Sequence, residues 1–121
     1  MVMRDKWNVD YTDEFGAWWE DQSVDVQEKL YKVVSLLEIH GPTLGFPYSS
    51  DIKGASIAMR ELRAQCDGHP YRVLYVFDPS RSAVLLIGGD KTGEKNWYER
   101  MVPIAEKIYK DYLRELEEET R

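Results

Sequence analysis

The sequence predicts an α+β fold in which helices pack on one face of a small, mainly antiparallel sheet, leaving the other face open for a ligand. Apolar residues recur at helical spacing in two segments, and three consecutive segments are rich in β-branched, aromatic and other apolar residues. Short, turn-rich segments separate these three strands, which favours an antiparallel meander over crossover connections. The predicted order along the chain is strand, helix, helix, strand, strand, strand, helix.

The first element is a short strand, and a short helix follows it. Residues 7–11 alternate apolar and polar side chains, as a half-buried strand does. Thr12 or Asp13 can cap the helix, because both side chains accept hydrogen bonds from free backbone N–H groups. Three aromatic side chains then recur at i, i+3 and i+4 and are expected in the core: Phe15, Trp18 and Trp19.

The second helix is predicted from an apolar repeat that reaches Ile39. Asp25 and, three residues later, Glu28 resemble a capping box at its start. The dipeptide 41–42, Gly-Pro, ends it, because glycine accepts the left-handed cap and proline cannot continue the helix. Residues 43–54 are rich in glycine, proline and serine and predict an extended surface loop.

The three strands of the meander are predicted at 58–65, 71–77 and 82–89. Residues 83–87 are apolar at every position, so this strand is expected to be covered on both faces or central in the sheet.

The last element is a helix over residues 97–118, after a polar loop at 90–96. Pro103 lies near its start. Because proline is tolerated in the first turn but not deep in a helix, either 97–101 forms a separate short turn or the helix bends at Pro103.

The composition is typical of one domain, 1–121. The chain has 121 residues, 43% hydrophobic and 31% charged, which fits one hydrophobic core better than two. No apolar run approaches the roughly 18 residues that cross a bilayer, and the first residues lack the apolar core of a signal peptide, so we expect a soluble cytoplasmic protein. The single cysteine, Cys66, argues against an intramolecular disulfide and a cysteine-based metal site.

The net charge of −6 is distributed unevenly. Residues 1–52 carry 4 Lys/Arg and 10 Asp/Glu, residues 53–100 carry 8 and 6, and residues 101–121 carry 4 and 6. Surfaces that bind phosphate are normally basic. The middle segment is therefore the part suited to nucleic acid, whereas the acidic ends are typical of solvated helix surfaces.

Most catalytic residue sets are missing from the sequence. The two histidines, His40 and His69, are too few for a multi-histidine metal site and leave little for a Ser-His-Asp arrangement. The string at 88–93, Gly-Gly-Asp-Lys-Thr-Gly, lacks the glycine spacing of a P-loop. We therefore predict no metal and no cofactor, and the sequence argues against a nucleotide triphosphatase. What remains is a set of cations in and beside the predicted sheet: Lys53, Arg60, Arg63, Arg72, Lys91 and Lys95.

Arg63 and Arg72 fall opposite each other if the loop between the first two meander strands holds the four residues 66–69. Two positive charges directly opposite each other on neighbouring strands destabilise a sheet unless an anion compensates them. Glu61 lies on the same face as Arg63 by two-residue alternation, so a cross-strand ion network is one interpretation and a phosphate site is another. A five-residue loop separates the arginines to opposite faces, and the sequence leaves both registers open.

Three motifs carry a resemblance to a known family. They are Arg-Glu-Leu-Arg at 60–63, Gly-His-Pro-Tyr-Arg-Val-Leu-Tyr-Val-Phe-Asp at 68–78 and Leu-Leu-Ile-Gly-Gly-Asp-Lys-Thr-Gly at 85–93. Trp-Tyr-Glu at 97–99 and Pro-Ile-Ala at 103–105 extend the match. With these motifs the sequence resembles the phage-derived HigB-like toxins of the RelE/ParE superfamily of type II toxin–antitoxin systems, over nearly the whole chain.

The resemblance implies a RelE-like, microbial-RNase-like sheet that cleaves translated mRNA, often on the ribosome, and that a HigA-type helix-turn-helix antitoxin silences. It assigns catalysis to Arg63, Arg72 and Lys91, without a metal. Related toxins often use a histidine or tyrosine near the chain end, and Tyr98 is the candidate here. Further RNA contacts are expected from the cations Lys53, Arg60 and Lys95.

The chemistry of such a site follows from charge. When an RNA 2′-hydroxyl attacks the neighbouring phosphorus, negative charge gathers on the phosphoryl oxygens, and paired guanidinium groups of Arg63 and Arg72 supply bidentate donors. Lys91 either holds phosphate or acts as the general base, a role that requires its neutral form to be favoured by desolvation or neighbouring cations. Two alternatives use the same fold: a ParE-like gyrase inhibitor, and a catalytically decayed member that only binds antitoxin.

Overall fold

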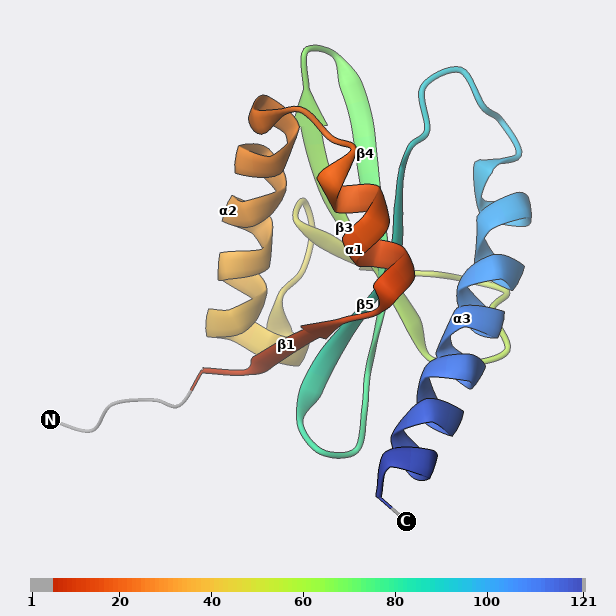
Figure 1. The fold of residues 1–121 in the computed structure, drawn as a ribbon. Coiled ribbons are helices and arrows are strands. Elements are labelled where there is room, and N and C mark those ends of the chain that lie inside the picture. The colour runs from red at the N-terminus through yellow and green to blue at the C-terminus, as the bar shows by residue number, and fades with distance from the viewer. Residues whose placement is uncertain (1–5, 121) are drawn as a thin grey trace, which may run out of the picture.

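The computed structural model describes residues 6–120, which form a five-stranded mixed sheet with helices on both faces (Figure 1). In chain order the elements are β1 (Asn8–Tyr11), α1 (Asp13–Glu20), α2 (Val24–His40), the 3₁₀ turn η1 (Gly41–Thr43), β2 (Ser49–Asp51), β3 (Met59–Cys66), β4 (His69–Phe77), β5 (Ser82–Asp90) and α3 (Trp97–Glu119). The strand order across the sheet is β1-β5-β4-β3-β2. The α+β class and the antiparallel meander β3-β4-β5 are confirmed.

The sheet contains one strand that the sequence did not predict. β2 lies inside the segment 43–54, which we expected to be a loop, and pairs antiparallel with β3 at one edge. Its three residues, Ser-Ser-Asp, carry no apolar alternation, so the strand depends on its partner rather than on local preference. At the opposite edge β1 pairs parallel with β5.

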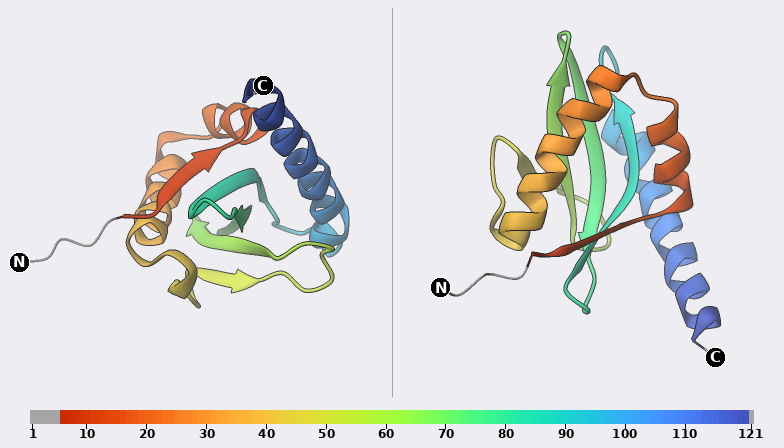
Figure 2. Two further views of the ribbon diagram at one scale, coloured as in Figure 1. Left: turned by 90° about the horizontal axis from the view of Figure 1, so that it is seen from below. Right: turned by 60° about the vertical axis from the view of Figure 1, so that its left-hand side comes forward.

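Helices cover both faces of the sheet, so the expectation that they pack on one face is wrong (Figure 2). Alternate residues of β4 point to opposite sides: Val73 and Tyr75 pack with α1 and α2, whereas Leu74 and Val76 pack with α3. Because strands alternate with a period of two, a strand that is apolar at every position needs cover on both sides. The apolar run of β5, buried over 83–86, was the signal for this second helical layer.

The helix boundaries confirm some of the predicted caps and correct others. Thr12 caps α1 by accepting a hydrogen bond from the backbone N–H of Phe15. The cap of α2 is Ser23, not Asp25, because the Ser23 hydroxyl accepts from the N–H of Val26. α3 continues through Pro103, so there is no separate turn at its start.

The aromatic stripe of α1 is only partly in the core. Phe15 is buried, while Trp18 and Trp19 are half-buried and pack against the same cluster. No helix among residues 6–120 combines the length and apolar character that crossing a bilayer requires.

Candidate functional site

The hairpin between β3 and β4 places Arg63 directly opposite Arg72 on one face of the sheet. The pairing continues to Cys66 and His69, so the connecting turn is only two residues, Asp67 and Gly68, rather than four. Both turn residues have positive φ, as a tight hairpin of this kind requires. Of the two registers that the sequence left open, the one that brings the arginines together is confirmed.

Glu61 lies at the centre of the polar network on this face. Its Oε1 is 3.0 Å from Arg72 Nε and accepts a hydrogen bond from the Tyr98 hydroxyl at 2.5 Å. Its Oε2 accepts from the Ser50 hydroxyl at 2.9 Å and lies 3.7 Å from Arg63 Nη1. One buried carboxylate therefore joins β2, β3, β4 and α3.

Arg72 and Glu61 form a buried ion pair, with side chains 7% and 6% exposed. The pair is held by charge more than by hydrogen bonding, because no acceptor among residues 6–120 is well aligned with the Arg72 Nε–H. Arg72 Nη1 donates to the carbonyl oxygen of Tyr71. The cross-strand ion network, one of the two interpretations drawn from the sequence, therefore describes Arg72 in this structure.

Arg63 is the accessible member of the pair, with its side chain 28% exposed. Its guanidinium lies 5.1 Å from the ring centroid of Phe46, which is exposed in the segment before β2. A cavity of about 360 Å³ opens beside it and is lined by Arg63, Arg72 and two lysines of α2, Lys29 and Lys32. No carboxylate of residues 6–120 lines this cavity, and its four cations outnumber the adjacent carboxylate of Glu61, so its electrostatic field favours an anion.

Tyr98 and Lys91 complete the network from the α3 side. The Lys91 ammonium lies 4.9 Å from the centroid of the Tyr98 ring, within the range of a cation–π contact. Burial raises the pKa of the Tyr98 phenol, and the hydrogen bond to Glu61 raises it further. At neutral pH the phenol is therefore protonated and acts as a hydrogen-bond donor.

The remaining predicted cations do not join this cluster. Arg60 points to the opposite face, where it donates to the Tyr75 hydroxyl, to Ser49 Oγ and to the Leu44 carbonyl oxygen, and pairs with Asp51. These contacts stabilise the α2 side of the sheet. Lys53 and Lys95 are exposed in the loops before β3 and before α3.

Several polar contacts were missed in the sequence. Lys29 and Lys32 reach the cavity from α2, and their spacing of three residues on one helix face was the available signal. His69 Nδ1 lies 2.8 Å from Asp90 Oδ2 and 3.0 Å from the Thr92 hydroxyl at the end of the sheet. Nothing local in the sequence connects these three residues, because strand pairing brings them together. Residues 6–120 contain no group of three or more His, Cys, Asp or Glu side chains that could hold a metal ion.

The fold is that of the RelE toxins. A mutant of Escherichia coli RelE in the free state superposes with a TM-score of 0.59 over 79% of this chain and 95% of RelE, at 13% identity. The isolated E. coli RelE toxin superposes with a TM-score of 0.50 over 81% of this chain and 98% of that chain, at 14% identity. At these identities the likeness concerns the fold alone.

Sequence comparison identifies the family within that fold class. The profile of the phage-derived Gp49-like proteins matches residues 17–110. The candidate toxin HigB3 of Mycobacterium tuberculosis is 38% identical over 98 residues, which cover 79% of this chain and 84% of that protein. The candidate toxin HigB2 of the same organism is 30% identical over 115 residues, 93% of this chain but only 57% of that longer protein. The chain belongs to the phage-derived Gp49-like family, and the predicted likeness to HigB-type toxins of the RelE class is confirmed.

Proposed function

We propose that this chain is the toxin of a type II toxin–antitoxin system and that it inhibits translation by cutting mRNA. The observation that carries this proposal is the cavity beside the β3–β4 hairpin, which Arg63, Arg72, Lys29 and Lys32 line together and which no carboxylate of residues 6–120 lines. Cationic donors grouped in this way are suited to an RNA phosphate. The likeness to HigB-type toxins supports the same function.

The proposed reaction uses the RNA's own 2′-hydroxyl as the nucleophile. Its oxygen attacks the adjacent phosphorus, the bond from phosphorus to the 5′-oxygen breaks, and the products are a 2′,3′-cyclic phosphate and a 5′-hydroxyl. The negative charge that builds on the phosphoryl oxygens is stabilised by fixed cations, and no metal or cofactor takes part.

The residues divide into accessible and buried groups in this proposal. Arg63 contacts the scissile phosphate, because its guanidinium is exposed at the cavity. Arg72 is buried and attracts the phosphate through its charge without touching it. Direct contact with the phosphate would require Arg72 to give up its pairing with Glu61. In this proposal Lys91 holds an adjacent phosphate or serves as the base, and the protonated Tyr98 donates a proton or a hydrogen bond once its hydroxyl exchanges its bond to Glu61.

The proposed substrate is mRNA on the ribosome in the cytoplasm, with Lys53 and Lys95 as outer contacts to the RNA backbone. The proposed partner is a HigA-type helix-turn-helix antitoxin. A net charge of −6 leaves the chain with little general attraction for free RNA, so presentation of the strand by the ribosome would supply what the surface charge does not.

The test compares Arg63→Ala and Arg63→Lys with the matched control Arg100→Ala. Arg100 is an exposed arginine whose guanidinium pairs with Glu94, outside the cavity. We expect Arg63→Ala to lower mRNA cleavage by about 100-fold or more, the usual loss when one transition-state donor is removed. Arg63→Lys should restore only part of the activity, because it cannot bind bidentately. Growth and transcript integrity after induction are the measurements, with thermal melting to confirm folding.

The outcomes separate the competing functions. Unchanged cleavage by folded Arg63→Ala would contradict the assigned site. DNA damage with intact transcripts would indicate a ParE-like gyrase inhibitor instead. Harmless overproduction of the folded wild-type chain would indicate a catalytically decayed member.

A further inference from the structure

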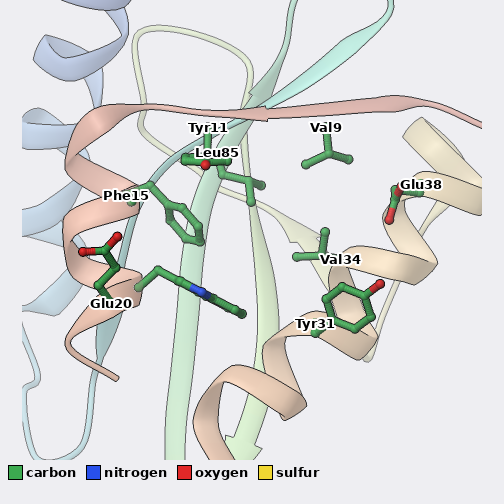
Figure 3. A pocket seen from close by; sticks show the side chains of 10 residues that line it. Val9, Tyr11, Phe15, Glu20, Tyr31, Val34, Glu38 and Leu85 are labelled. Carbon is green, nitrogen blue, oxygen red and sulfur yellow. The ribbon is translucent and has the colours of Figure 1, made fainter. Parts of the chain in front are cut away.

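A second cavity lies on the face of the molecule formed by β1, α1 and α2, and none of its described lining residues comes from α3 (Figure 3). It has a volume of about 330 Å³. The apolar side chains that form it come from all three elements and from β5, and they are Val9, Phe15, Trp19, Val34 and Leu85. None of them belongs to the cationic network described above.

Two tyrosines at this groove are exposed to solvent. Tyr11 is 63% exposed and Tyr31 is 64% exposed, and both line the cavity. Figure 3 shows Tyr31 and Val34 on α2 facing Phe15 of α1 across the opening. Exposed aromatic rings beside an apolar depression are typical of protein interaction surfaces, where tyrosine supplies both apolar area and a polar tip.

The charged side chains that line the groove are negative. Glu20 and Glu38 line it, and no lysine or arginine within residues 6–120 does. Tyr11 also lines an adjoining cavity of about 270 Å³ between α1 and α3. This adjoining cavity is lined by the carboxylates Asp13, Glu14, Asp111, Glu115 and Glu119, and by no lysine or arginine of residues 6–120. Asp111 pairs with two cations of its own helix, Lys107 and Arg114.

This charge pattern selects the kind of partner. A nucleic acid or an anionic lipid surface would be repelled by the carboxylates. A polypeptide segment with apolar side chains on one side and lysine or arginine beside them is complementary to the apolar groove and to its acidic rim. Its apolar side fills the groove, and its cations lie against the carboxylates.

We propose that the groove between β1, α1 and α2 is a docking site for a cationic, amphipathic segment of a partner protein. An apolar side chain of the segment packs between Phe15, Trp19 and Val34. Its lysines or arginines lie beside Glu20 and Glu38 and extend past Tyr11 toward the adjoining acidic cavity. This docking site is separate from the proposed cleavage site, and its existence does not require that the chain cleaves RNA.

The experiment uses a synthetic helical peptide of leucine and lysine whose leucines share one face. A scrambled peptide of the same composition and charge, which has no apolar face, is its control. Binding to the full-length chain is followed by amide chemical shifts in NMR spectra. We expect shifts at Phe15, Gly16, Trp19 and Val34 with the amphipathic peptide, and no saturable shifts at these residues with the scrambled one.

Matched charge reversals test the electrostatic part. Glu20→Lys/Glu38→Lys should lower the affinity for the amphipathic peptide by about tenfold or more, since two attractions become repulsions. Glu28→Lys/Glu118→Lys changes the net charge equally at exposed positions outside both cavities and should weaken binding by less than about threefold. Tyr31→Ala, at an exposed position with little folding risk, should also weaken binding.

Three results would overturn the proposal. The first is equal binding of the scrambled peptide, which would mean general attraction to an acidic chain. The second is equal weakening by both charge reversals, and the third is shifts confined to other surfaces. A loss of mRNA cleavage in Arg63→Ala bears only on the proposed function, so the two proposals fail independently.

Discussion

Glu61 is the residue on which the stability of the candidate site depends most. It is a buried carboxylate that pairs with Arg72 and accepts hydrogen bonds from Tyr98 and Ser50. Removal of one partner of a buried pair leaves the other charge without compensation, which is far more costly than the loss of a surface pair.

We therefore predict that Glu61→Ala lowers the free energy of unfolding by about 3–5 kcal/mol. Glu61→Gln should cost less, because its amide oxygen still accepts the Tyr98 hydrogen bond. Urea denaturation is the measurement. The control is Glu94→Ala, which removes an exposed pair with Arg100 and should cost about 1 kcal/mol or less. A similar loss in both variants would contradict the buried network.

Asp90 predicts a pH-dependent contribution to stability. Burial by itself would raise the pKa of Asp90, but hydrogen bonds from Thr92 and His69 outweigh it and lower the pKa. A folded-state pKa below the unfolded value of about 3.9 means that the contribution is fully present above that pH and is lost as pH falls through the folded pKa. The stability difference between wild type and Asp90→Asn should therefore shrink below about pH 4, as measured by urea unfolding from pH 7 to pH 3.

Thr92→Val is the companion variant for Asp90, since it removes the hydroxyl that donates to the carboxylate. It should reduce the loss of stability at acid pH. A difference between wild type and Asp90→Asn that stays constant with pH would show that the carboxylate charge is not what matters at this position.

At the scale of elements, the contact between α1 and β5 depends on the absence of a side chain at residue 88. A Cβ on Gly88 would lie 2.4 Å from the Trp18 ring, which itself packs against Phe15 and Tyr71. Trp18 cannot move away without disturbing these neighbours. The glycine therefore sets how closely the first helix approaches the sheet.

Gly88→Ala is predicted to destabilise the fold by about 1–3 kcal/mol, the usual cost of overpacking. Gly45→Ala is the control and should change stability by less than about 0.5 kcal/mol, because the nearest atom to its added Cβ is 4.0 Å away. The double variant Gly88→Ala/Trp18→Leu should recover part of the loss. Equal stability of wild type and Gly88→Ala would contradict the close approach.

At the scale of the whole molecule, two regions of the surface have opposite electrostatic character. Cations gather at the hairpin edge beside Arg63, whereas carboxylates surround the groove of α1 and α2. The net charge of −6 hides this division. We therefore expect long-range attraction of RNA to be weak, and the proposed contact with mRNA to depend on a few cations.

We predict that binding of naked single-stranded RNA is weak, with a slope of log affinity against log salt of about −1 to −3, as expected when two to four phosphates are neutralised. The same mRNA should be cut much faster when it is translated than when it is free. Cleavage assays with and without ribosomes at matched salt are the measurement. Rapid cleavage of naked RNA at physiological salt would contradict the proposed need for the ribosome.

The sequence by itself determined the features that depend on local pattern. Helical and strand periodicity located α2, α3 and the meander, and the short turn between β3 and β4 limited Arg63 and Arg72 to two registers, of which the structure shows the one that pairs them. The family motifs lie on these same strands. Each of these features is decided by residues close together in the chain, so it can be predicted from the sequence alone.

Only the tertiary structure decided the rest. The short strand β2, the burial of Arg72 against Glu61, the turning of Arg60 to the opposite face and the lysines of α2 beside Arg63 all depend on contacts between distant segments. The side of the sheet that α3 covers is likewise set by packing, because an amphipathic helix buries its apolar stripe against whichever apolar surface is left open. Burial and partner choice are properties of the assembled sheet, because a local pattern shows which face of an element is apolar or charged but not which distant segment packs against that face.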